Sequence, residues 1–177
     1  MTTFLLMRHA QPDFSALERL NSAGWPVDIA PLATSGEQQV IGQMSKIIEF
    51  NPEVIVASPL TRALHTAALV LAKIDVPFKV EFDLYDWLPD IQYKRLTMDE
   101  LRARQNEYNS LKGEWPAGET RPWETVSGMR RRVTDVLRKY EAYSRVLAVF
   151  HQEPIRVVSG AGEVGLAALV RFELPAQ

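Results

Sequence analysis

The 177-residue chain contains no cysteine, which excludes disulfide bonds, thiolate metal sites and cysteine nucleophiles. It also lacks an excess of one charge, since 20 Lys and Arg residues stand against 22 Asp and Glu residues, a formal net charge of −2. A nearly neutral chain has no general attraction to nucleic acid or to an anionic membrane, so any anion site must be local. No apolar run approaches the roughly 18 residues of a membrane-spanning helix, and no leader-like segment is recognisable. We therefore expect a cytoplasmic protein that binds neither nucleic acid nor membrane.

The composition is that of a globular protein with one hydrophobic core. Hydrophobic residues make up 46% of the chain and charged residues 24%, both ordinary values for a globular domain. A chain of this length suits one domain, and no repeat, low-complexity tract or linker divides it. We predict a single domain over residues 1–177, with residues 83–123 as a cap or loop region over a pocket.

Strand-like and helix-like segments alternate along the sequence. Short apolar runs predict strands at Thr3–Met7, Val54–Ala57, Phe78–Phe82, Arg145–Phe150 and, at an edge of the sheet, Ala168–Leu174. Apolar residues at helical spacing predict helices over about 35–50, after Ser58-Pro59, and from Val126 to Tyr140, and a further helix is expected after His151. This alternation predicts an α/β fold, a three-layer sandwich with a mostly parallel sheet between helices.

Local signals mark two helix starts and one long connection. Thr34 with Glu37, and Thr97 with Glu100, have the spacing of a capping box. Residues 9–33 hold three prolines and a glycine and are predicted to form a long loop, which in a compact domain is usually functional.

Three of the predicted strands are followed by residues suited to phosphate chemistry. Arg8 and His9 end the first strand region, Arg62 comes shortly after the second, and His151 directly follows the fourth. The carboxyl ends of parallel strands lie at one edge of a sheet, where ligands bind, so we expect these four side chains to meet. An arginine fork matches two phosphate oxygens, and a neutral histidine is a good nucleophile toward phosphorus. The pattern predicts a site for phosphoryl chemistry.

Four segments resemble, in the same order, the signature segments of the histidine phosphatase superfamily, also called the phosphoglycerate mutase-like family. These segments are Leu6-Met7-Arg8-His9-Ala10, Pro31-Leu32 with Gly36 and Gln39, Ser58-Pro59-Leu60-Thr61-Arg62-Ala63 with Thr66-Ala67, and Phe150-His151 with Ile155-Arg156. Each is short, but the ordered set over about residues 2–158 is specific. The resemblance implies a phosphoglycerate mutase-like α/β fold.

The resemblance also implies a role for each matched residue. His9 would be the nucleophile that takes the phosphoryl group, while Arg8, Arg62 and His151 would bind the phosphate and stabilise its charge. The family uses a carboxylate after the third strand as acid and base, and Asp86 is the candidate for that role. Partial burial beside Trp87 would raise the pKa of Asp86 toward the value a proton donor needs. The other candidates for this role are Asp83 and Asp90.

Three substitutions depart from the family pattern, and the asparagine often found a few positions after the nucleophile has no clear counterpart among the nearby polar residues Gln11, Asp13 and Ser15. Ala10 stands in place of the usual glycine beside the nucleophile, Gln152 in place of the glycine after the second histidine, and Asp86 in place of the usual glutamate. These departures concern the rate and the acid/base rather than the fold.

Other conspicuous residues have structural interpretations. We expect a structural role for His65, and a solvated helix face with salt bridges for Arg130, Arg131 and Arg132. The four tryptophans at positions 25, 87, 115 and 123 are either core residues or walls of the pocket. No cluster of His, Asp and Glu has metal-ligand spacing, so we predict no metal and no cofactor.

The sequence favours a metal-independent phosphatase that hydrolyses a phosphomonoester through a phosphohistidine at His9. Its partner would be a small phosphorylated metabolite or a phosphoprotein. One alternative is a mutase, which would need to keep water out during phosphoryl transfer. Another is a module that binds phosphate without hydrolysing it, which the three departures favour. The sequence indicates no oligomeric state.

Overall fold

Five strands form one sheet in the computed structural model, which describes residues 2–15 and 25–174. The strands are β1 Thr3–Arg8, β2 Val54–Ala57, β3 Phe78–Val80, β4 Arg145–Phe150 and β5 Leu169–Glu173. Their order is β3-β2-β4-β1-β5, with parallel pairing except at the edge, where β5 is antiparallel to β1. The predicted α/β fold with a mostly parallel sheet is confirmed.

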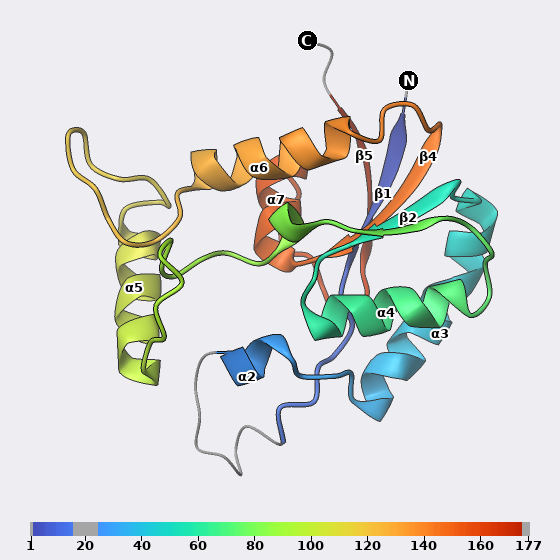
Figure 1. Cartoon of the computed structure of the whole chain (residues 1–177), viewed down its shortest axis with the longest axis horizontal. Coiled ribbons are helices and arrows are strands. Elements are labelled where there is room, and N and C mark those ends of the chain that lie inside the picture. The colour runs from blue at the N-terminus through green and yellow to red at the C-terminus, as the bar shows by residue number, and fades with distance from the viewer. Residues whose placement is uncertain (1, 16–24, 175–177) are drawn as a thin grey trace.

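Helices cover both faces of this sheet, which gives three layers (Figure 1). Helices α3 (Thr34–Phe50) and α4 (Thr61–Leu71) pack on one face, and α6 (Val126–Arg138) and α7 (Gln152–Ser159) pack on the other. Three further elements are α2 (Trp25–Asp28), the 3-10 turn η1 (Phe82–Leu84) and α5 (Met98–Ser110). Part of the predicted 9–33 loop, residues 16–24, lies outside the described residues, and α2 occupies its later part.

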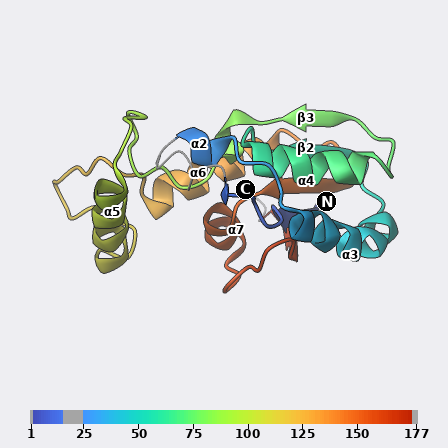
Figure 2. The same ribbon diagram turned by 90° about the horizontal axis from the view of Figure 1, so that it is seen from below.

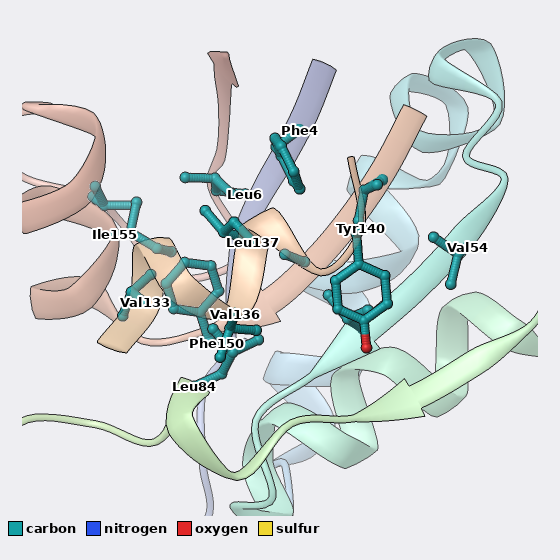
Figure 3. Close-up of a cluster of buried hydrophobic side chains, with 14 residues drawn as sticks. Phe4, Leu6, Val54, Leu84, Val133, Val136, Leu137, Tyr140, Phe150 and Ile155 are labelled. Carbon is teal, nitrogen blue, oxygen red and sulfur yellow. The ribbon is translucent and has the colours of Figure 1, made fainter. Parts of the chain in front are cut away.

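Alternating side chains along the central strands supply two separate cores. Phe4 and Leu6 of β1 face α6 and α7, whereas Leu5 and Met7 face α3 and α4. Successive residues of a strand point to opposite faces, so a strand that is apolar throughout buries both. Figure 3 shows the first core, in which Leu84 of η1 joins the side chains of α6 and the sheet.

The two predicted capping boxes have different outcomes. Thr97 and Glu100 form a complete box at the start of α5, with reciprocal side-chain to backbone hydrogen bonds. The box predicted at Thr34 is wrong, because Ala33 is the N-cap of α3 and no side chain caps this helix. The start of α3 is instead seated on the chain after His9, where the N–H of Ala33 donates to the carbonyl of Gln11 at 2.9 Å.

Residues 83–123 extend to one end of the molecule, where α5 lies beyond α6 and α7 (Figure 2). A row of aromatic rings holds this segment together, with centroids 4.8 Å apart from Trp87 to Tyr108, 5.4 Å from Tyr108 to Trp123 and 6.4 Å from Trp123 to Trp115. These three tryptophans therefore pack within the segment. Its function as a cap stays a prediction.

In the described ranges, no helix has the length and apolarity needed to cross a membrane.

Candidate active site

The carboxyl ends of three neighbouring strands deliver the candidate residues to one edge of the sheet. His9 directly follows β1, and its N–H donates to the carbonyl of Phe150 at the end of β4. His151 follows Phe150, and Ser58 follows β2 with its N–H on the carbonyl of Val149. Parallel pairing thus brings together segments that are far apart in the sequence.

His9 is oriented by hydrogen bonds at both ring nitrogens. His9 is only 6% exposed. Its Nδ1 lies 2.8 Å from the carbonyl oxygen of Ala10, and its Nε2 lies 3.2 Å from Nε of Arg62. Burial lowers the pKa of His9 from 6.5 to about 4, and the nearby charge of Arg62 acts in the same direction. Near neutral pH the ring is therefore uncharged, with its proton on Nδ1 and its lone pair on Nε2.

His151 is fully buried and has one ring nitrogen without a hydrogen bond. Its Nε2 lies 2.7 Å from Oγ of Ser58, while Nδ1 has no hydrogen-bond partner. The rings of His9 and His151 are 5.2 Å apart. Burial lowers the pKa of His151 well below its ordinary value. Ser58 had no role in the sequence prediction, although its position directly after β2 was the available signal.

Arg62 connects three parts of the site. It lies in the first turn of α4 and is buried, and its Nε donates to His9. Its two terminal nitrogens donate to the carbonyl of Val27 and to Oδ2 of Asp86, each at 3.2 Å. The next turn of α4 supports the chain after His9, because Oγ1 of Thr66 accepts from the N–H of Ala10. One guanidinium thus touches both the candidate nucleophile and the candidate acid.

Arg8 is held from the far side of the site. Its Nη1 donates to the side-chain carbonyl of Gln152 and, at 2.7 Å, to the main-chain carbonyl of Val164. Its Nε is buried without a hydrogen-bond partner. Gln152, one of the departures from the family pattern, is therefore a partner of a predicted phosphate ligand. Another departure, Ala10, is buried and is not among the residues with positive φ, so its methyl group imposes no backbone strain.

Asp86 lies beside these groups on the irregular chain after η1. Its Oδ2 is 3.2 Å from Arg62 and 3.6 Å from Nδ1 of His151, and its Oδ1 accepts from the N–H of Trp87. Burial by itself would raise the pKa of Asp86, but the neighbouring His151 and Arg62 and the hydrogen bond from the Trp87 N–H outweigh burial and lower it. The expected raised pKa is therefore wrong.

The other two carboxylate candidates do not reach the histidines. Asp90 is buried in an ion pair with Arg104 at 3.3 Å, and its Oδ1 accepts from the N–H of Gln92. Asp83 enters the network through its main-chain carbonyl, which accepts from Arg132. Asp86 is the candidate whose carboxylate contacts Arg62.

His65 and the arginine run have different outcomes. His65 takes the expected structural role, since its Nδ1 accepts from the N–H of Leu32 and its Nε2 lies 3.6 Å from Glu37. Arg130 and Arg131 are exposed as predicted, but Arg132 is mostly covered, so the prediction of a solvated side chain is wrong there. The position of Arg132 on α6 directs its side chain inward, onto the buried carboxylate of Glu124.

The assembled site suits a tetrahedral anion. Arg8, Arg62 and His151 offer donors around the lone pair of His9, so a phosphate placed among them would meet positive charge on one side and a nucleophile on another. Among the described residues, no group of three or more His, Cys, Asp and Glu side chains could hold a metal ion. The expectation that no metal takes part stays a prediction.

Several solved structures have a fold similar to that of this chain. A native mycobacterial glucosyl-3-phosphoglycerate phosphatase is 18% identical, with a TM-score of 0.73 over 96% of this chain and 89% of that chain. The alpha-ribazole phosphatase from Shigella flexneri is 19% identical, with a TM-score of 0.68 over 98% and 91%. Bacillus stearothermophilus YhfR is 20% identical, with a TM-score of 0.70 over 99% and 92%. A search of the curated proteins found no match.

These solved structures confirm the predicted phosphoglycerate mutase-like fold. The sequence model of the histidine phosphatase superfamily (branch 1) matches residues 4–176, which is nearly the whole chain. Both findings are consistent with the predicted enzyme class, a phosphoric monoester hydrolase. The chain belongs to the histidine phosphatase superfamily.

Proposed function

We propose that this protein is a phosphatase that hydrolyses a phosphomonoester through a phosphohistidine on His9. The observation that carries the proposal is the state of the His9 ring. A neutral imidazole with its proton held on Nδ1 by Ala10 keeps a lone pair on Nε2, where Arg62 would also bring a phosphate oxygen. The nucleophile His9 and the phosphate-binding Arg62 are then both within reach of one bound phosphoryl group.

The proposed first step forms the Nε2–P bond as the ester P–O bond breaks. Arg8, Arg62 and the unpaired Nδ1 of His151 stabilise the phosphoryl oxygens. Asp86 gives its proton to the departing alkoxide. In the second step Asp86 takes a proton from water as that water attacks phosphorus, the N–P bond breaks, and phosphate leaves with His9 and Asp86 restored.

Substrate binding would cause Asp86 to take up from solvent the proton that it needs as the acid. Arg62 lowers the pKa of Asp86 through its positive charge. A bound phosphate dianion shares Arg62 and places negative charge beside the carboxyl group, and both changes raise that pKa. Asp86 would then be protonated in the substrate complex, where a proton donor is required.

We propose a small phosphorylated metabolite as the substrate, acted on in the cytoplasm, with a phosphoprotein as the alternative. Two of the structural neighbours are named as phosphatases of glucosyl-3-phosphoglycerate and alpha-ribazole phosphate, which supports the metabolite class without selecting one metabolite. A cap formed by residues 83–123 would favour a small molecule, and an open site would favour a phosphoprotein. The near-neutral net charge gives no support to a nucleic-acid substrate.

A phosphate-binding module without turnover is the second candidate function. The lowered pKa of Asp86 favours it, because a carboxylate that stays ionised when phosphate binds cannot protonate a leaving group. Hydrolysis separates the two functions.

The test measures hydrolysis of p-nitrophenyl phosphate in the presence of EDTA, with trapping of the phosphorylated enzyme by rapid denaturation at alkaline pH. We expect turnover and an acid-labile phosphoryl group in the wild type, and loss of both in His9→Ala by a factor of about 1,000 or more. His65→Asn is the matched control, because it changes a histidine outside the site and keeps an acceptor for Leu32. Phosphate binding without turnover in the wild type would support the binding module. Turnover that persists in His9→Ala would remove His9 as the nucleophile.

A further inference from the structure

Arg132 uses every donor of its side chain, and three of its five hydrogen bonds hold the chain segment that carries Asp86. Its Nε and Nη2 donate to the two carboxylate oxygens of Glu124 at 2.6 and 2.8 Å. The remaining bonds run to three main-chain carbonyls, those of Asp83 at 2.6 Å, Tyr85 at 2.9 Å and Asp86 at 3.1 Å. A guanidinium has five N–H groups, so these five bonds leave none free.

Burial and stacking limit the movement of this arginine. The side chains of Arg132 and Glu124 are only 11% and 9% exposed, and the guanidinium carbon lies 3.8 Å from the centre of the Tyr85 ring. A bidentate arginine–carboxylate pair fixes the plane of the guanidinium as well as its position. Helix α6 thereby presents a rigid donor surface to the chain from Asp83 to Asp86.

This surface matters because the Asp86 segment has little other regular structure. Strand β3 ends at Val80, η1 spans only three residues, and the residues after it form no helix or strand up to α5. Leu84 anchors η1 in the core, two residues before Asp86 (Figure 3). Arg132 binds the carbonyl of Asp86 itself, the residue whose carboxylate faces Arg62 and His151.

Glu124 also secures the chain on the far side of Asp86. Its main-chain carbonyl accepts from Nε1 of Trp87 at 2.9 Å, and its N–H donates to the carbonyl of Leu88 at 2.9 Å. Asp86 is therefore bracketed, by Arg132 before it and by Glu124 after it.

We propose that Arg132, oriented by Glu124, is a positioning residue for Asp86 that governs proton transfer to the leaving group and leaves phosphate binding unchanged. The inference rests on the proposed function, in which Asp86 is the acid. No atom of Arg132 is hydrogen-bonded to Arg8, His9, Arg62 or His151, and Arg132→Lys keeps the positive charge that acts on His151. Loss of the guanidinium fork should therefore reach the reaction through Asp86. A displacement of about 1 Å of a reacting group can cost about 100-fold in rate.

Two probe substrates separate proton transfer from phosphate binding. The leaving group of β-glycerophosphate needs a proton, whereas nitrophenolate departs from p-nitrophenyl phosphate without one. The ratio kcat/KM reports events up to departure of the alcohol, so it isolates the step in which Asp86 acts as the acid. We expect Arg132→Lys, which keeps the charge but loses the fork, to lower kcat/KM for β-glycerophosphate about 10- to 100-fold. For p-nitrophenyl phosphate we expect a change below about threefold, with the inhibition constant of inorganic phosphate within about twofold.

Matched variants decide the interpretation. Arg131→Gln, at the exposed neighbour on the same helix, should behave as the wild type toward both substrates. Glu124→Gln keeps the shape of the partner and should show the Arg132→Lys pattern to a smaller extent, which provides a second test if the lysine variant does not fold. Combining Arg132→Lys with Asp86→Asn should add little to the loss in Asp86→Asn alone, because both changes act on one proton transfer.

The outcomes also separate this inference from the proposed function. If Asp86→Asn loses activity on β-glycerophosphate but Arg132→Lys and Glu124→Gln do not, the positioning role is overturned and the acid assignment stands. Equal losses on both substrates with weaker phosphate inhibition would overturn it too, since they indicate a general distortion of the site. If Asp86→Asn keeps wild-type activity on both substrates, the acid assignment fails and the positioning role fails with it.

Discussion

At the scale of single residues, the predicted phosphate site depends on side chains that other residues hold in place. Arg8 would be free to rotate at the sheet edge without the two carbonyl oxygens that accept from its Nη1. One of these belongs to Gln152, a residue that stands where the family usually has glycine. The glutamine therefore compensates, in part, for the cost of holding a long flexible side chain in one geometry.

Replacing Gln152 with alanine tests this interpretation. Arg8 would keep the carbonyl of Val164 but lose its side-chain partner, so we expect KM and the inhibition constant of inorganic phosphate to rise about 3- to 10-fold, with kcat within about twofold. Steady-state kinetics with phosphate as inhibitor measures all three values. Tighter phosphate inhibition in Gln152→Ala would instead mean that the glutamine competes with phosphate for Arg8.

At the scale of elements, the start of α3 sets the path of the chain after the nucleophile. A Cβ atom on Gly36 would lie 2.3 Å from the carbonyl oxygen of Gln11, so only glycine allows this close approach. Three residues further along, the side-chain carbonyl of Gln39 accepts from the N–H of Gln11 at 2.9 Å. The helix thus fixes Gln11, two residues after His9, and the resemblance at Gly36 and Gln39 has a physical explanation.

The contrast between two glycines of α3 provides the second test. Gly36→Ala should lower the free energy of unfolding by about 1–3 kcal/mol and kcat/KM about tenfold, because the main chain at Gln11 must move. Gly42→Ala is the control, since its new Cβ would meet no atom within 4 Å. Alanine favours the helix, so Gly42→Ala should raise the free energy of unfolding by about 0.4–1 kcal/mol at unchanged activity. Denaturant unfolding of both variants and the wild type measures the difference, and equal stability of the two variants would contradict the predicted clash.

At the scale of the whole molecule, two buried neutral histidines couple folding to pH. The pKa of His9 is about 4 in the folded protein against an ordinary value of 6.5, and the pKa of His151 is also lowered by burial. Between these pH values the unfolded chain binds more protons than the folded protein. Stability therefore rises with pH across this window and is lost as the pH falls through it.

We expect the free energy of unfolding to fall by about 3 kcal/mol for His9 alone between pH 6.5 and 4, since one pKa unit corresponds to about 1.4 kcal/mol. His9→Gln removes this titration, so its stability should depend less steeply on pH than that of the wild type. Denaturant unfolding at several pH values in this range, on both proteins, checks the prediction. The same pH dependence in both proteins would show that His9 does not contribute.

The predictability of the site differed from residue to residue. Arg8, His9, Arg62 and His151 could be predicted to meet because each lies at or shortly after the end of a strand, and parallel strands carry such residues to one edge. The pKa of Asp86 was predicted in the wrong direction, because the sequence indicates burial beside Trp87 but not the distance to Arg62. Arg132 was misassigned for the same reason, since a run of three arginines does not reveal which one meets a buried carboxylate.

The sequence alone determined the order of strands and helices, the two faces of the sheet and the residues at its active edge. These follow from periodicity and motifs, which act over a few residues along the chain. Only the tertiary structure decided how Gln152 holds Arg8, how Gly36 seats the nucleophile loop, and how Arg132 and Glu124 bracket Asp86. Those contacts join residues distant in the chain, and their geometry and electrostatics depend on distances of a few ångströms that arise only when the elements pack.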